Sequence, residues 1–550
     1  MKKTYFLLLL LILFSTNVFA QYDLENIKIT YGTELPDDKV KIVKIFGEDN
    51  GKIYALGLKG KEDYYIKTFS SGDMKLLSNK LIQLPELIDK EIEFEEVALL
   101  EGKPYIIGSV YHKKEKIYTL VGLELGEDGK LKKNMITLFE AGVARNNEKG
   151  AFYFKNSPDE KSILIMHTAI FEKEDALKYE IKLFDSSLKQ IFSNIDKVSY
   201  DDSKKDYQFT LSDFDVNVTN DVFLVVNESF RDSKKKEKVE KFQVFAFKAS
   251  NSYKKEVIDI NFKDKEIINC KMLATNKNTL QLVGFYSSVR DNGKANKELK
   301  GVYNATIDLA TNVNNNLKFN EFDYATKVKL LGERRAKKGK DVKPLYNIHT
   351  IIEKNDGGLI VLSEYQLIIV GQKQGIGPLG IQPITYITNE IIVTALKPDG
   401  SLEWSNVVAK DQDATITVAS FNLFAASGNA NFAVGLGLSI PLGVMGKGPE
   451  YLSAIPIYKD GQLNIVFNDN KKNKGITDIE EIKNLGNYNN AVPTLFRFDD
   501  KGKITRFDPE DVIKNELVIR PGVFYRKSDN ELLIYASRKK SDKLGRVIIQ

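Results

Sequence analysis

Few side chains in this 550-residue sequence have the types and the spacing that an active site requires. The chain has three histidines, His112, His167 and His349, and no two of them stand at the short spacing of a metal site. A Ser-His-Asp hydrolase would need one of them as its general base, yet no Gly-x-Ser-x-Gly sequence accompanies them. His167 and His349 lie in apolar stretches, where a hydrogen-bonded core histidine is more common than a ligand. The sequence therefore predicts no catalytic set, no cofactor site and no metal site.

Other polar and aromatic residues have simple structural interpretations. The carboxylate pairs Asp201-Asp202 and Asp499-Asp500 fall where turns are expected, and turns favour aspartate. Residues 468–470 supply several oxygen atoms but lack the spacing of an EF-hand calcium loop. Trp404 ends an expected strand, which favours a core anchor over a platform for sugars. A glycosidase needs two carboxylates facing each other across a cleft, and the sequence does not identify such a pair.

Composition describes a large folded protein. Hydrophobic residues make up 42% of the chain, charged residues 28% and aromatic residues 10%, which is enough for a large core and argues against disorder. The formal charge is only +5, and lysines alternate with acidic residues, so no stripe for nucleic acid is expected. The single cysteine, Cys270, cannot form an internal disulfide and is expected to be a buried thiol.

The first 20 residues have the pattern of an export signal. Lys2 and Lys3 are followed by an apolar run at residues 6–14 and by a small-residue cleavage site at residues 18–20. No cysteine follows this site, and no later apolar run approaches the roughly 18 residues that span a bilayer. We therefore expect residues 21–550 to be exported without a membrane span. The expected location is the periplasm, the outer membrane or the outside of the cell.

A repeat runs through the whole chain, and its clearest copy lies at residues 97–131. Apolar stretches at residues 97–100, 105–108 and 117–121 are separated by tight turns at Glu101-Gly102 and Asp128-Gly129 and by a longer polar loop. This order predicts four strands joined by two hairpin turns and a loop between them. Similar units recur at intervals of about 50–60 residues, which is the length of a propeller blade with its loops.

The repeat predicts an all-β protein with one β-propeller domain at residues 21–550. We count eight four-stranded blades, or seven if two weak units belong to one blade. The last unit has only three strands, and an isolated strand at residues 27–31 is available to complete it. Such a strand from the beginning of the chain would close the ring and remove its free edge.

Turn sequences carry a resemblance to known proteins. Residues 156–161 (Asn-Ser-Pro-Asp-Glu-Lys) resemble the Ser-Pro-Asp-Gly-Lys turn of TolB-like propeller repeats, with Glu160 in place of glycine. Residues 397–400 and 498–502 are similar to the turn before the fourth strand in such WD40-like repeats. The resemblance to exported bacterial β-propellers covers most of the mature chain and implies a fold. Because propellers include enzymes, receptors and scaffolds, it implies no single function.

Three insertions interrupt the repeat, at residues 312–344, 371–386 and 414–446. The first is rich in Asn, Lys and Arg and is expected to be a solvated loop, with a short helix at residues 324–335. The second divides the sixth unit, and the third contains no charged residue. The third insertion has three interpretations: core strands of a blade with both faces buried, an apolar surface that projects together with the second insertion, or a membrane hairpin.

A projecting apolar surface on a rigid scaffold would bind a protein partner. The residues predicted to do so are Ile376, Pro378, Leu379, Ile381, Phe421, Phe424, Leu436, Leu438, Leu442 and Met445. The resulting functional hypothesis is a non-enzymatic propeller scaffold of a bacterial cell envelope, in the form of an accessory subunit of an outer-membrane complex. An exported propeller with an apolar loop is similar to what the plug subunit of a type 9 secretion translocon would require. The alternative is a propeller that binds or degrades glycans at its central channel.

Overall fold

The computed structural model describes most of the chain after the expected export signal. It describes residues 21–60, 62–126, 129–143, 145–171, 176–199, 204–232, 238–262, 265–275, 277–288, 296–374, 381–418, 432–434, 448–509, 517–538 and 541–550. The expected export signal at residues 1–20 lies outside the described residues. None of the helices in the described ranges is long and apolar enough to cross a bilayer.

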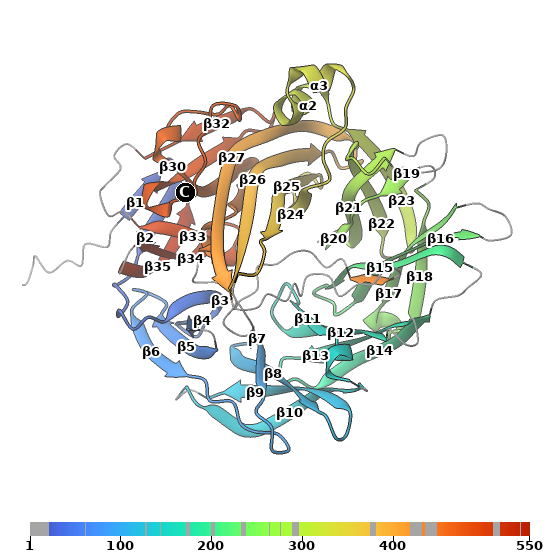
Figure 1. The fold of residues 1–550 in the computed structure, drawn as a ribbon, viewed down its shortest axis with the longest axis vertical. Helices are drawn as coiled ribbons and strands as arrows, with labels where there is room; N and C mark the ends of the chain where they lie inside the picture. The colour runs from blue at the N-terminus through green and yellow to red at the C-terminus, as the bar shows by residue number, and fades with distance from the viewer. Residues whose placement is uncertain are drawn as a thin grey trace, which may run out of the picture.

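Eight antiparallel sheets stand around a common axis, and each sheet is one blade of a propeller (Figure 1). The first four blades follow one another along the chain. Their strands are β3 (Lys41–Asp49), β4 (Lys52–Lys59), β5 (Asp63–Ser70) and β6 (Leu76–Leu81); β7 (Glu93–Leu100), β8 (Lys103–His112), β9 (Ile117–Leu125) and β10 (Leu131–Gly142); β11 (Ala151–Asn156), β12 (Ser162–Phe171), β13 (Ala176–Asp185) and β14 (Gln190–Ser199); and β15 (Lys204–Val216), β16 (Val222–Asp232), β17 (Lys238–Phe247) and β18 (Lys255–Ile260).

The remaining four blades complete the ring. Their strands are β19 (Lys265–Ile267), β20 (Lys271–Ala274), β21 (Thr279–Ser288), β22 (Gly301–Asp308) and β23 (Val313–Glu321); β24 (Tyr346–Glu353), β25 (Leu359–Val370), β26 (Gln382–Leu396) and β27 (Leu402–Val418); β29 (Ile455–Lys459), β30 (Gln462–Asn470), β31 (Ala491–Phe498) and β32 (Ile504–Phe507); and β33 (Val518–Ser528), β34 (Glu531–Arg538), β35 (Ser541–Ile549), β2 (Ile27–Tyr31) and β1 (Gln21–Leu24). The chain is an eight-bladed β-propeller.

Tight turns and apolar middle strands explain why each blade forms. In blade one, Asn50 and Gly51 both have positive φ, 48° and 73°, as a two-residue hairpin turn of the primed type requires. The middle strands of the blades are the most deeply buried. In β9, for example, Leu120 and Val121 are both fully buried, because Leu120 packs toward blade three and Val121 against the segment between blades one and two.

The ring closes in the way that the sequence predicts. Strand β2 pairs antiparallel with β35, from Ile27 opposite Ile549 to Tyr31 opposite Gly545. Strand β1 then pairs with β2 and makes blade eight five-stranded, which the sequence did not indicate. Ion pairs also connect blade eight to blade one, because Lys527 Nζ and Arg546 Nη2 both lie 3.2 Å from Glu48 Oε1.

The first insertion is shorter than the sequence suggested. Its beginning is β23, the outer strand of blade five, so it is regular structure and not a loop. The short helix expected at residues 324–335 is present as two helices, α2 (Tyr324–Leu331) and α3 (Glu333–Lys337). Cys270 lies buried between β19 and β20, and burial raises the pKa of its thiol to about 12, which makes it an unreactive core residue.

Candidate functional site

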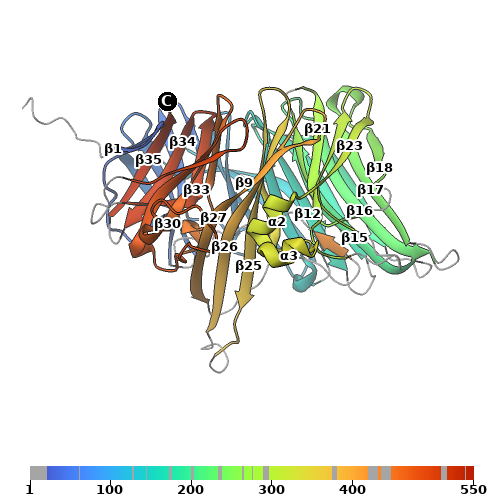
Figure 2. The same ribbon diagram turned by 90° about the horizontal axis from the view of Figure 1, so that it is seen from above.

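Blade six extends beyond the face of the disc as a three-stranded arm (Figure 2). We call the arm residues 366–370 of β25, 382–388 of β26 and 412–418 of β27. These stretches pair in register, with Ile369 opposite Thr385 and Thr385 opposite Thr415. Strand β24 stops pairing at Tyr346, opposite Tyr365, so the arm has no fourth strand among the described residues. At the base of the arm, Gln366 N–H donates to the carbonyl oxygen of Leu345 and Asp413 N–H to that of Leu485. Beyond these contacts, no strand in the described ranges pairs with either edge of the arm.

One face of the arm is packed against the propeller. Ile384 and Tyr386 are 0% and 3% exposed, and the side chains of Ala414 and Ile416 are also buried. They form a small core with Leu452, in the segment before blade seven. This burial explains why the strands continue past the disc, since alternate apolar residues have a surface to pack on.

The opposite face of the arm is open to solvent and carries almost no charge. Because side chains alternate along a strand, this open arm face contains the residues between the buried ones. They are Leu367, Ile369, Pro383, Thr385, Ile387, Asp413, Thr415 and Thr417. Ile369 is 48% exposed, and Asp413 at the base of the arm is the only charged residue in the three stretches. Ile369, Thr415 and Thr417 are exposed and the other five residues are half-buried, so this face mixes apolar side chains with threonines. A nearly uncharged surface of this kind can bind another protein.

Buried charges hold the base of the arm. Lys410 Nζ lies 3.2 Å from Glu364 Oε1, and the two side chains are 0% and 1% exposed. Burial raises the pKa of Glu364, but the charge of Lys410, the imidazole of His349 and hydrogen bonds from Gln366 and Ser453 together outweigh this effect and lower the pKa below its usual value. Burial also lowers the pKa of Lys410. Nζ donates further to the carbonyl oxygen of Thr388, at 2.6 Å, so the charge links the outer strand of blade six to the strand beside it.

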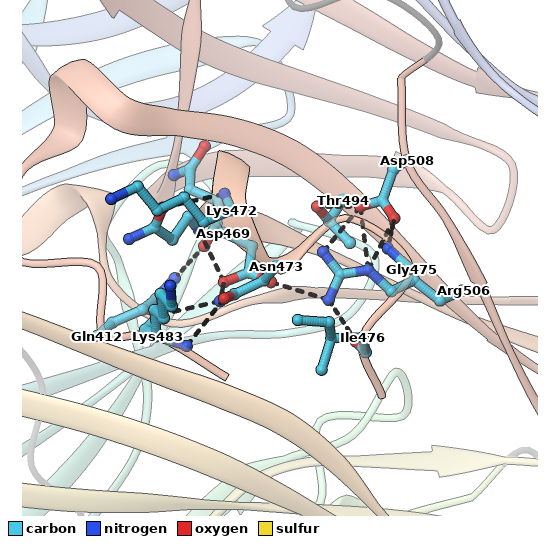
Figure 3. Close-up of polar contacts among 12 residues, drawn as sticks. Gln412, Asp469, Lys472, Asn473, Gly475, Ile476, Lys483, Thr494, Arg506 and Asp508 are labelled. Atoms are coloured by element: carbon cyan, nitrogen blue, oxygen red, sulfur yellow. Dashed lines mark hydrogen bonds and ion pairs between the residues drawn. The ribbon is translucent and has the colours of Figure 1, made fainter. Parts of the chain in front are cut away.

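The arm is also joined to blade seven. Gln412 Nε2 donates to the carbonyl oxygen of Asn468 at 2.6 Å, and Gln412 forms a parallel bridge with Leu485 in the loop that follows β30. Arg506 fixes this loop (Figure 3): its guanidinium contacts Asp469 at 2.9 Å and donates to the carbonyl oxygen of Ile476 at 2.8 Å. The base of the arm is thus rigid, because it is bonded to the cores of two blades.

The third insertion joins two distant blades. Its first residues, 414–418, belong to β27, where Thr415 and Thr417 are exposed while Ala414 and Ile416 are buried. Further on, β28 (Phe432–Val434) pairs in parallel with residues 209–211 of β15, the inner strand of blade four. Figure 1 shows β28 on the axis side of that blade. The interpretation as core strands of one blade, buried on both faces, is therefore wrong for the described part.

The second insertion follows the tip of the arm, but its boundaries need correction. Residues 382–386 are part of β26, and Ile384 is fully buried, so this end is strand and not loop. Ile381 lies directly before β26 and is 50% exposed. It exchanges two backbone hydrogen bonds of 2.8 Å with Gln374. The other nine predicted partner-binding residues lie outside the described residues: Ile376, Pro378, Leu379, Phe421, Phe424, Leu436, Leu438, Leu442 and Met445.

The inner strands bring charged residues together on the axis side of blades three to five. Asp213 of β15 lies 3.8 Å from Lys271 of β20, and its carboxylate accepts hydrogen bonds from the backbone N–H groups of Phe214 and Met272, each at 3.0 Å. Burial raises the pKa of the neighbouring Asp215, whereas Asp213 and Asp215 raise the pKa of Lys155 against the effect of burial. Asp213 thus serves to connect two inner strands.

The remaining residues with potential chemistry have structural roles. Burial lowers the pKa of His167 to about 4, and His167 Nε2 lies 2.7 Å from the carbonyl oxygen of Lys149. The indole of Trp404 stacks on Phe498 at 5.6 Å, at the side of a groove of about 310 Å³ between blades six and seven. In the described ranges, no group of three His, Cys, Asp or Glu residues is arranged to hold a metal ion.

Comparison with known proteins finds only distant structural similarity. No protein-family model matches the chain, and no curated protein matches its sequence. Similar solved structures include a quinohemoprotein alcohol dehydrogenase from Comamonas testosteroni, with 8% identity over 95% of this chain and 76% of that one and a TM-score of 0.41. A prolyl endopeptidase has 10% identity and a TM-score of 0.34, over 92% of this chain but only 55% of its own. The Dos1 propeller has 12% identity and a TM-score of 0.32, over 61% of this chain and 70% of that one. Identities and scores this low say nothing of activity.

Proposed function

We propose that this protein is a non-enzymatic propeller scaffold of a bacterial cell envelope and that the arm of blade six binds a protein partner. The observation that carries this proposal is the open arm face, which is partly apolar, nearly uncharged and bonded to blade seven at its base. A site that is fixed before binding loses less conformational entropy when a partner docks. The export signal expected at residues 1–20 supports a location in the periplasm or at the outer membrane.

The open edges of the arm favour a protein over a lipid bilayer as its partner. Gly371 N–H donates to the carbonyl oxygen of Pro383 at 2.8 Å, and in an antiparallel pair the alternation then directs the N–H and C=O groups of Ile368 and Val370 toward the open edge. In hydrocarbon, each unsatisfied backbone group would cost several kcal/mol. A protein can satisfy these groups by adding a strand of its own.

The more specific form of this proposal is an accessory subunit of an outer-membrane protein complex, such as the plug of a type 9 secretion translocon. Its support is limited to the expected export signal, the propeller and the projecting arm. The alternative, a glycan site at the channel, is not favoured by the inner strands, because Asp213 is engaged in contacts between blades.

The proposal is tested by adding charge to the open arm face at Ile369 and to Ile381, the residue directly before β26. The double variant Ile369→Asp/Ile381→Asp should remain folded, because both side chains are about half exposed. It should lose at least nine-tenths of the partner that co-purifies with the wild type after gentle detergent extraction of the native envelope.

The matched control introduces the same charges elsewhere. Ile195 in β14 and Val257 in β18 are 56% and 50% exposed on the outer strands of blades three and four. The variant Ile195→Asp/Val257→Asp should retain its partner. A wild-type protein that is strictly monomeric in the extract, or equal retention by both variants, would contradict the proposal.

A further inference from the structure

A strongly basic surface lies at the base of the arm. We call it the α2–α3 surface, and it carries seven exposed cations: Lys329, Arg334, Arg335, Lys337, Lys338, Lys340 and Lys343. Glu333 is the only exposed acidic residue between Lys329 and Lys343, and it pairs with Lys337 at 2.7 Å. Among the described residues, no carboxylate lies within ion-pair distance of Arg334, Arg335 or the lysines at positions 338, 340 and 343. This concentration of charge is unusual in a chain whose lysines and acids otherwise alternate.

The α2–α3 surface is fixed to the blade that carries the arm. Asp323 caps α2 by accepting a hydrogen bond from the N–H of Thr326 at 2.7 Å. Lys327 is buried and paired with Glu321 at 2.8 Å and Asp341 at 3.4 Å, so it anchors the helix and does not contribute to the surface. Lys329 Nζ donates to Asn406 Oδ1 of β27 at 2.5 Å. Since β27 continues into the arm, blade six carries both the cations and the open arm face, and Figure 1 shows α2 and α3 at the rim of the disc beside β27.

Uncompensated like charges repel one another and produce a positive potential that attracts anions. An extended polyanion can contact several of these side chains at once, and arginine can bind carboxylates through two parallel hydrogen bonds. The C-terminus of α3 carries the partial negative charge of the helix dipole. Lys337 and Lys338 lie at this end, so their positive charges stabilise the helix even without a ligand. A surface of this kind is therefore stable alone and still able to bind.

We propose that the α2–α3 surface binds an acidic segment of the same protein partner that contacts the arm. This inference rests on the proposed function, because the arm supplies the reason to expect a protein. The partner would then have an uncharged site for the arm and acidic residues beside it. The charges would orient the partner and speed its association, whereas the arm would supply most of the buried apolar area.

The experiment measures binding of a fluorescent peptide of sixteen glutamates by anisotropy, with the mature protein at 25 and 300 mM NaCl. We expect binding at low salt and at least a tenfold weaker affinity at high salt, because exposed charges are screened. The triple variant Arg334→Glu/Arg335→Glu/Lys338→Glu should reduce the affinity at low salt at least tenfold. Its melting temperature should fall only slightly, because all three side chains are exposed and only Lys338 lies at the C-terminus of α3.

A matched variant controls for net charge. Lys113, Lys114 and Lys133 are exposed lysines of blade two, on the opposite side of the ring in Figure 1. The variant Lys113→Glu/Lys114→Glu/Lys133→Glu changes the net charge by the same amount and should bind the peptide as the wild type does. Equal losses in both triple variants, or no binding by the wild type, would overturn the inference.

Two further measurements distinguish a failure of this inference from a failure of the proposed function. The protein should not sediment with vesicles of phosphatidylcholine that contain 30% phosphatidylglycerol. If it sediments with them but does not bind the peptide, then the α2–α3 surface binds anionic lipid and the inference is wrong. The arm variant Ile369→Asp/Ile381→Asp should bind the peptide normally while losing its partner. If peptide binding fails but the arm variant still loses its partner, then the inference is wrong and the proposed function stands.

Discussion

Lys410 and Glu364 are opposite charges enclosed within blade six, and the position of the arm depends on them. The variant Lys410→Met would leave the Glu364 carboxylate buried without its cation, so we expect a loss of about 3–5 kcal/mol in the free energy of unfolding. Urea denaturation of the purified protein measures this quantity. The variant Glu364→Gln/Lys410→Met should recover most of the loss, since it removes both charges together. A single variant as stable as the wild type would show that the pair is not needed.

Glu48 gives a prediction for pH. Burial raises the pKa of Glu48, but hydrogen bonds from Arg546, Ser71 and Lys527 and the charge of Arg546 together outweigh this effect and hold the pKa below its ordinary value of 4.5. A carboxylate with a lowered pKa contributes stability that is present above pH 4.5 and is lost as the pH falls through the folded-state pKa. The wild type should therefore be more stable than Glu48→Gln at pH 7, and the difference should shrink below pH 4.5. Thermal unfolding from pH 3 to 7 measures it, and a constant difference would contradict the assignment.

At the scale of elements, the two faces of the arm should respond differently to truncation. Ile384→Ala removes a fully buried side chain from the small core around Leu452 and should cost about 2–5 kcal/mol. Ile369→Ala on the open arm face should change the free energy of unfolding by about 0.5 kcal/mol or less. Chemical denaturation of both variants checks the comparison. Equal costs would mean that the open face is covered in solution.

The arm also shows where sequence reasoning reached its limit. Period-two alternation and Gly-containing turns identified the eight blades, because those signals are local. The sequence showed the break in blade six as an insertion. Ile384 and Thr385 have similar neighbours in the sequence, so only the tertiary structure decides which of the two side chains is buried. Lys410 follows three apolar residues, and a lysine in such a run is the one signal that could have indicated a buried charge. The pairing of β28 with β15 joins residues more than 200 positions apart, and no local pattern reports it.

At the scale of the whole molecule, the ring depends on strand β2, the second strand of the described residues. Removing residues 21–31 would leave the edge of β35 open and expose the apolar residues packed on Ile27 and Ile29. We expect this truncated chain to aggregate or to unfold at a much lower urea concentration.

A permuted chain provides the control. Gln550 N–H donates to the carbonyl oxygen of Asn26 at 2.9 Å, so a short turn can connect the end of β35 to β2. Residues 27–31 placed after Gln550 through a four-residue turn should restore most of the urea midpoint. A truncated chain as stable as the intact one would contradict the role of β2 in closing the ring.

The central functional claim is that the arm of blade six touches a protein partner, and photo-crosslinking in the native envelope tests it most directly. A benzophenone amino acid would replace Ile381, which is 50% exposed directly before the arm stretch of β26, or Ile195, which is 56% exposed on the outer strand of blade three. Irradiation should produce a protein adduct of defined mass at position 381 and none at position 195. No adduct at position 381, or the same adduct at both positions, would contradict the claim.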